Sequence, residues 1–155
     1  MQINRDAPVM AVGELDVSAA PEAVWDVLAD LAQWPEWNAD ITEVSVDGPL
    51  AAGTRFRWKS GPGWITSVLR EVDPPRTLGW TGTTFSIKAV HVYRIDPRDG
   101  ATKVRLEESW EGLLASVLRR PFRRMLQKAI DTGLVRLKSE VERRTALDRR
   151  PEPPS

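Results

Sequence analysis

Apolar residues recur with two different periods along the chain, and the change of period separates strand-forming from helical regions. Residues 9–17 are rich in apolar side chains and predict a first strand. Apolar residues between 24 and 31 then follow the i, i+3, i+4, i+7 spacing of an amphipathic helix. Pro21 suits the first turn of this helix, because its φ is already helical there. Residues 34–38 predict a second, short helical turn with proline at its start.

Between residues 41 and 111, short β-rich runs are separated by turn signals such as Ser60-Gly61-Pro62-Gly63. This texture predicts six strands, near residues 41–47, 53–60, 63–72, 76–83, 86–96 and 101–111. The last run alternates most clearly, with Val104, Leu106, Glu108 and Trp110 on one face. Such alternation is typical of an antiparallel sheet with one covered face and one wet face. Glu107 and Glu111 are expected on the wet face.

Residues 113–144 return to helical spacing and predict one long helix with a single apolar stripe. Pro121 lies inside this pattern and predicts either a kink or a break with a new start. Gly133 costs roughly 1 kcal/mol in a helix interior relative to alanine. It therefore either allows a close approach to the sheet or leaves room for a ligand.

The predicted order of elements is β-α-α-β(6)-α, in which helices do not alternate with strands. We therefore expect an α+β protein with a curved antiparallel sheet against the long C-terminal helix. A single domain is expected over residues 1–146, because 155 residues suit one hydrophobic core. The Pro-rich segment 147–155 is expected to be a disordered tail.

Composition excludes several classes of site. The absence of cysteine excludes disulfides, thiolate metal sites and cysteine nucleophiles, and the single histidine excludes a site with two imidazoles. No metal and no cofactor are expected. No apolar run approaches the length of a transmembrane helix, and the first residues lack the apolar core of a signal peptide, so a cytoplasmic location is expected.

Charge is balanced overall but unevenly distributed. The chain has 22 basic and 22 acidic residues, which argues against general nucleic-acid binding. Basic residues exceed acidic ones by six from residue 119 onward. The run Arg119, Arg120, Arg123 and Arg124 admits three interpretations: contact with anionic lipid headgroups, contact with an acidic protein partner, or a solvated helix face that balances the acidic remainder.

Three segments carry a family resemblance: residues 20–30 with 34–38, residues 53–58, and residues 100–112 before the long helix. Together they resemble the SRPBCC superfamily, which includes START-related lipid-transfer domains, the birch-pollen-allergen fold and polyketide cyclase/dehydrase-like proteins. The resemblance extends over residues 9–144. It implies a helix-grip architecture, in which the sheet wraps the C-terminal helix and leaves a deep apolar cavity between them.

The resemblance also implies binding or transport of a small hydrophobic ligand of the lipid, polyketide or aromatic class. Aromatic residues expected in the cavity wall are Phe56, Trp58, Trp80, Tyr93, Trp110 and Phe122. Aliphatic residues expected to complete it are Leu69, Leu106, Leu126, Ile130 and Leu134. The alternative is that these rings simply fill the core, as buried aromatic side chains often do. Trp34 and Trp37 are expected to pack the short helices or to gate the cavity mouth.

Three polar residues, Ser67, His91 and Glu108, are expected to orient the polar groups of a ligand. His91 serves either as a proton donor or acceptor or as a structural residue bonded to a side chain of a neighbouring strand. Glu108 needs a donor, a water or a ligand if it is buried; otherwise it reaches solvent or pairs with an arginine near the end of the sheet. Ser67 offers its hydroxyl to a ligand or bonds locally.

Two further functions remain as alternatives. One is a polyketide cyclase or dehydrase-like enzyme, in which His91 or Glu108 moves protons. The other is a protein-binding module that uses the basic helix or the Trp34 and Trp37 pair. The sequence leaves open the ligand, whether any reaction is catalysed, whether the cavity is open or filled, and the oligomeric state.

Overall fold

The computed structural model describes residues 1–149 and consists of one antiparallel seven-stranded sheet and four helices within that range. The strands lie in the order β1-β7-β6-β5-β4-β3-β2, so that neighbours in the chain are neighbours in the sheet except at β1. The elements are β1 (Val9–Val17), α1 (Pro21–Ala29), a 3₁₀ turn (Leu31–Gln33), α2 (Trp34–Trp37), β2 (Ile41–Asp47), β3 (Arg55–Ser60), β4 (Gly63–Asp73), β5 (Thr77–Thr84), β6 (Ile87–Arg98), β7 (Ala101–Glu111), α3 (Leu113–Val117) and α4 (Arg119–Asp148).

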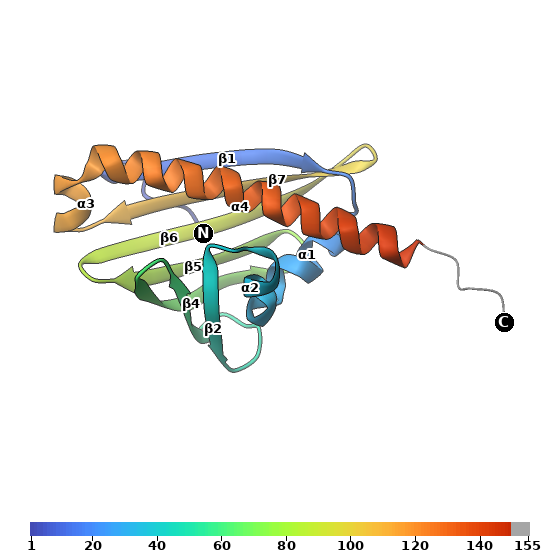
Figure 1. Cartoon of the computed structure of the whole chain (residues 1–155), viewed down its shortest axis with the longest axis horizontal. Helices are drawn as coiled ribbons and strands as arrows, with labels where there is room; N and C mark the ends of the chain where they lie inside the picture. The colour runs from blue at the N-terminus through green and yellow to red at the C-terminus, as the bar shows by residue number, and fades with distance from the viewer. Residues whose placement is uncertain (150–155) are drawn as a thin grey trace.

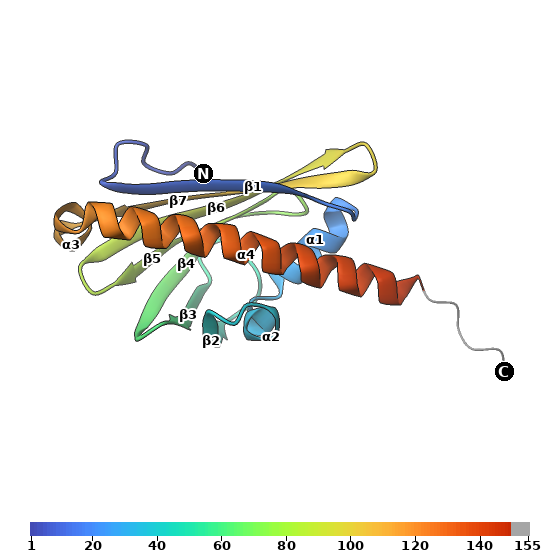
Figure 2. The same ribbon diagram turned by 45° about the horizontal axis from the view of Figure 1, so that its top comes forward.

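The predicted α+β order and the helix-grip architecture are confirmed. The sheet curves, and α4 crosses its concave face from one end of the molecule to the other (Figures 1 and 2). All seven strands lie within two residues of their predicted bounds. The core is formed by the inner face of the sheet, the apolar side of α1 and the buried residues of α4.

The predicted break at Pro121 is also confirmed. α3 ends at Val117, Leu118 has a non-helical backbone conformation, and α4 begins at Arg119. Pro121 therefore lies in the first turn of α4, where its missing N–H leaves no helical hydrogen bond unmade. α4 is 30 residues long and continues to Asp148, so the predicted disordered tail is wrong for residues 147 and 148, which are helical; residues 150–155 lie outside the described residues. No helix within residues 1–149 has the apolar length needed to cross a membrane.

The close approach between helix and sheet occurs at Gly13 of β1. A Cβ atom on Gly13 would lie 2.6 Å from Ile130 Cγ2 and 2.9 Å from Leu134 Cδ1, so any side chain at position 13 would push these side chains of α4 away. At Gly133 of α4 the nearest atom to such a Cβ is the side-chain amide nitrogen of Asn38, at 3.8 Å. Of the two interpretations of Gly133, the structure thus supports the one in which it leaves space.

One prediction about the outer face is wrong. Glu107 does lie on that face, but it is buried with 4% of its surface exposed. The segment before β1 folds over it: Ile3 is buried there, and Arg5 reaches Glu107 at 3.5 Å. Arg105 and Arg94 also pair with the Glu107 carboxylate, at 3.2 and 3.5 Å. Glu111, expected to be wet as well, is half-buried and accepts a hydrogen bond from Asn4.

A candidate ligand cavity

A cavity of about 490 Å³ lies between the concave face of the sheet and α4. Its wall is formed by side chains of β3, β5, β6 and β7 on one side and of α4 on the other. The structure brings ten of the sequence-predicted residues to this wall: Trp58, Trp80, His91, Tyr93, Leu106, Glu108, Trp110, Phe122, Leu126 and Ile130. The aromatic set is therefore gathered around open space as well as packed against itself.

Four other predicted residues do not line the cavity: Phe56, Ser67, Leu69 and Leu134. All four are buried: Phe56, Ser67 and Leu69 lie on β3 and β4 beneath other core side chains, whereas Leu134 lies on α4 over Gly13 of β1. Phe56 lies under the rings of Trp34 and Trp80, each with its centroid 6.0 Å away. The hydroxyl of Ser67 accepts a hydrogen bond from Trp58 Nε1 at 3.0 Å, so this serine bonds locally and fixes a ring of the wall.

Trp34 and Trp37 both pack the short helices and border the cavity. Trp34 is buried, its Nε1 donates to the carbonyl oxygen of Leu28 at 2.9 Å, and its ring lies 5.3 Å from that of Trp80. Trp37 is half-buried beside it on α2. α2 thereby closes one end of the cavity with two indole rings.

The polar centre of the cavity is a histidine–glutamate pair. His91 on β6 and Glu108 on β7 stand directly opposite each other across the two strands, and both side chains are buried. His91 Nδ1 lies 3.0 Å from Glu108 Oε2, and the other carboxylate oxygen accepts a hydrogen bond from Trp110 Nε1 at 2.5 Å.

The imidazole is further held between tryptophan rings. The Trp80 ring stacks on His91 with centroids 4.8 Å apart and an interplanar angle of 13°. The Trp58 ring meets it edge-on at 5.9 Å. Among residues 1–149 no hydrogen bond joins His91 Nε2 to another protein group, and His91 lines the cavity. A carboxylate behind an imidazole is the usual arrangement for orienting a histidine that binds or transfers a proton.

Tyr93 adds a phenol to the same part of the wall, two residues from His91 on the same face of β6. Burial raises the pKa of this phenol, and the nearby charge of Glu108 raises the pKa further. Tyr93 therefore stays protonated at any physiological pH. Its hydroxyl is a hydrogen-bond donor toward the cavity, complementary to an acceptor oxygen on a ligand.

The titration of Tyr93 gives a direct test, because it is the only tyrosine of the chain. We expect no phenolate absorbance at 295 nm from the folded protein near pH 10, where a free tyrosine ionises at about that value. Since the unfolded chain then releases a proton that the folded chain keeps, the free energy of unfolding should fall as pH rises above about 10. Tyr93→Phe should remove that contribution; a normal phenolate titration in the folded protein would contradict the assignment.

Several wall residues were not identified from the sequence. Phe85 and Met125 border the cavity from the β5–β6 turn and from α4, and Ala89, Leu114 and Ala129 are among the other residues that line it. The alternation that places His91 and Tyr93 on one face of β6 also places Ala89 there. A phenylalanine in a turn carries no periodic signal, which is why Phe85 was not found.

Comparison with known proteins agrees with this geometry. A family model described as polyketide cyclase / dehydrase and lipid transport matches residues 11–142. No curated protein sequence matches the chain.

Solved structures show the same fold at low sequence identity. An aromatase/cyclase, ZhuI, from Streptomyces sp. R1128 superposes with a TM-score of 0.77 at 18% identity, covering 88% of this chain and 94% of that one. A START superfamily protein from Mycobacterium smegmatis gives 0.75 at 14% identity, with 86% and 97% covered. A hypothetical protein from Helicobacter pylori gives 0.82 at 15% identity, with 90% and 91% covered.

Proposed function

Because the chain belongs to the polyketide cyclase / dehydrase and lipid transport family, we propose that it binds a small hydrophobic molecule in the cavity beneath α4. The observation that carries this proposal is the cavity of about 490 Å³ with its aromatic wall. Ligand pockets in proteins commonly have volumes of about 300–1,000 Å³ and are mostly apolar with a few placed polar groups. Desolvation of the ligand against these rings supplies the binding free energy.

The distribution of polar groups defines the ligand further. His91, Glu108 and Tyr93 lie together on β6 and β7, whereas the remaining wall is dominated by rings and aliphatic side chains. The proposed ligand is therefore amphiphilic, with a flat or aliphatic apolar body and an oxygen-bearing polar end. That end accepts from the Tyr93 hydroxyl and contacts His91 Nε2.

Intrinsic fluorescence tests this proposal, since five of the seven tryptophans, Trp34, Trp37, Trp58, Trp80 and Trp110, line the cavity. Titration with 2-naphthol, a flat ring with one polar oxygen, should quench the protein saturably at one equivalent. A competing medium-chain fatty acid should restore the signal. Linear, unsaturable quenching equal to that of free tryptophan would contradict the proposal.

A second function, cyclisation or dehydration of a polyketide-like substrate, is favoured by one observation. This is the 3.0 Å contact between His91 Nδ1 and Glu108 Oε2 in the cavity, which suits His91 as a general base. With a poly-β-carbonyl substrate, His91→Gln should lower kcat by about 100-fold with little change in KM. A loss of only a few-fold in His91→Gln and in the double variant with Glu108→Gln would assign the pair to binding alone.

A further inference from the structure

α3 and the β5–β6 turn lie at the same end of the molecule (Figure 1). Both carry exposed apolar side chains. α3 starts directly against that turn, since a Cβ on Gly112 would meet the carbonyl oxygen of Ser86 at 2.0 Å. We call this end the α3 face and define its apolar part by five exposed residues: Phe85, Leu113, Val117, Leu118 and Met125.

The α3 face is continuous with the cavity. Phe85 and Met125 belong both to the exposed set and to the cavity wall, so the exposed apolar residues border the cavity. α3 is apolar on both sides: Ala115 is fully buried, while Leu113 and Val117 are 77% and 71% exposed. The outward apolar side chains contribute nothing to the core, and a contiguous apolar patch at the mouth of a cavity marks an interaction surface.

Phe85 is held there at a cost in backbone energy. It is 83% exposed and has a φ of +49°, a conformation that is unfavourable for a bulky residue. Glycine or asparagine meets this turn geometry more easily. The turn therefore does not require phenylalanine at position 85, and the exposed ring adds apolar surface to this end of the molecule.

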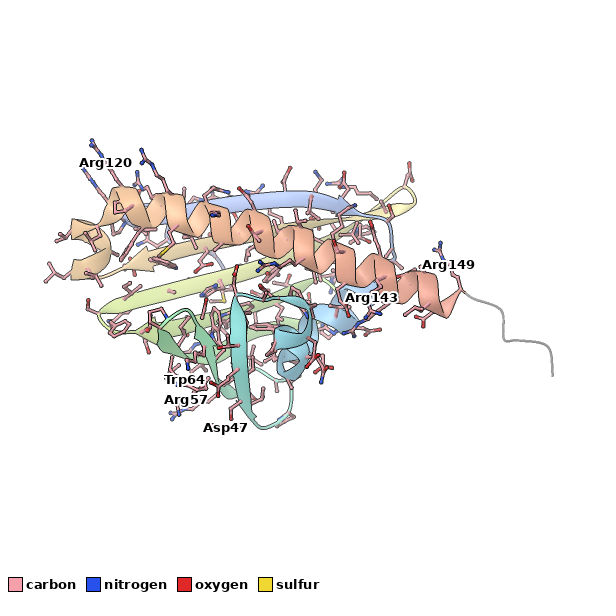
Figure 3. All side chains as sticks on the ribbon, in the orientation of Figure 1. Asp47, Arg57, Trp64, Arg120, Arg143 and Arg149 are labelled. Carbon is pink, nitrogen blue, oxygen red and sulfur yellow. The ribbon has the colours of Figure 1, made fainter. Side chains whose placement is uncertain are left out.

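Arginines flank the apolar residues on the first turns of α4. Arg119, Arg120 and Arg124 are exposed and make no ion pair within residues 1–149. Arg120 projects away from the sheet at this end of α4 (Figure 3). Arg123 joins them while its Nε donates to the carbonyl oxygen of Pro8 at 2.9 Å. Residues 119–128 include five basic and no acidic residues, in a chain of zero net charge.

We propose that the α3 face docks on the surface of an anionic lipid bilayer and places the mouth of the cavity against it. Protruding apolar side chains enter the boundary between headgroups and acyl chains, while arginines beside them meet the lipid phosphates. The charge complementarity selects an anionic surface. The docking proposal depends only on the residues of the α3 face. The further idea that docking lets the protein take a ligand from the bilayer depends on the proposed function.

Vesicle flotation tests the charge contribution. Vesicles of phosphatidylcholine with about a third phosphatidylglycerol should bind the protein at low salt, pure phosphatidylcholine should not, and added salt should weaken binding. Each arginine is expected to contribute about fivefold in affinity, so the triple variant Arg119→Gln, Arg120→Gln, Arg124→Gln should bind about 100-fold more weakly. The matched control is Arg55→Gln, Arg98→Gln, Arg149→Gln, which removes the same charge elsewhere and should bind like the wild-type protein.

The apolar contribution is tested with Phe85→Asn and with Leu113→Ser combined with Val117→Ser. Since these side chains are exposed, both variants should keep the wild-type melting temperature, and Phe85→Asn should equal or exceed it. Both should bind anionic vesicles at least about fivefold more weakly, because apolar insertion is lost.

The proposal would be overturned if the protein did not bind anionic vesicles at low salt, or if the arginine variant and its matched control lost vesicle affinity equally. It would also be overturned if light scattering showed a dimer of the wild-type protein and a monomer of the variant Leu113→Ser, Val117→Ser. The last result would assign the α3 face to self-association. 2-Naphthol quenching of the arginine variant separates the two proposals. If the arginine variant no longer floats with vesicles but its fluorescence is still quenched by 2-naphthol as in the wild-type protein, the docking proposal is supported. If the wild-type protein floats with vesicles but no protein shows saturable quenching, only the cavity proposal is refuted.

Discussion

Replacement of Gly133 by tryptophan is expected to weaken ligand binding by about 10- to 100-fold without unfolding the protein. Gly133 lies in the wall of the cavity, and its Cβ position is open except for the Asn38 amide 3.8 Å away. An indole at this position occupies space that the ligand needs. Overpacking typically costs about 1–3 kcal/mol, and a binding free energy weaker by that amount corresponds to the expected loss of affinity. The helix itself should gain, because glycine is a poor residue in a helix interior.

Gly133→Ala is the matched control for this prediction. A single methyl should raise the free energy of unfolding by up to about 1 kcal/mol through helix propensity. It should leave 2-naphthol affinity close to the wild-type value, because most of the space remains. Urea denaturation and fluorescence titration of the three proteins measure both quantities. Wild-type affinity in the tryptophan variant would show that the ligand binds outside this cavity.

Replacement of Glu108 by leucine is expected to destabilise the fold by about 3 kcal/mol. The carboxylate lies 3.0 Å from His91 Nδ1 and accepts a hydrogen bond from Trp110 Nε1, and leucine keeps neither interaction. A buried donor left without an acceptor costs about 1–3 kcal/mol, and the replacement removes the carboxylate from both His91 and Trp110. Urea denaturation should show the loss as a lower midpoint at an unchanged m-value.

The double variant His91→Leu, Glu108→Leu measures how strongly the two side chains depend on each other for stability. Once both partners are apolar, the double variant should be more stable than the sum of the single effects predicts, by about 1–3 kcal/mol. The control Glu14→Leu removes an exposed glutamate that pairs with Lys103 and Arg105, and it should cost less than about 1 kcal/mol. Additive single effects would mean that the two side chains do not depend on each other.

The sequence pattern predicted the main elements because their signals are local. Alternation along residues 101–111 identified the face shared by Leu106, Glu108 and Trp110, and Pro121 marked the break before the long helix. The pairing of His91 with Glu108 was not predicted, although a signal for it existed. The turn at Asp99-Gly100 closes the β6–β7 hairpin between Arg98 and Ala101, and counting back from that turn brings residue 91 opposite residue 108.

Other features of the site depend on contacts that have no local pattern. Alternation places Phe56, Ser67 and Leu69 on strands β3 and β4, but it does not say where the cavity ends along the sheet. The burial of Glu107 depends on residues 1–7 folding across the outer face, and that segment has no periodicity to indicate its path. The exposed ring of Phe85 is visible only once the turn that carries it is built. These features come from tertiary contacts between segments far apart in the chain.

Native mass spectrometry of the purified wild-type protein beside Gly133→Trp tests whether a ligand occupies the cavity. We expect the wild-type protein to carry one hydrophobic molecule, or to take up one equivalent of 2-naphthol, and the tryptophan variant to carry none under the same conditions. The mass released on denaturation then gives the class of the ligand. Wild-type protein that stays empty with excess 2-naphthol, or equal occupancy in the two proteins, would contradict a ligand site in the cavity beneath α4.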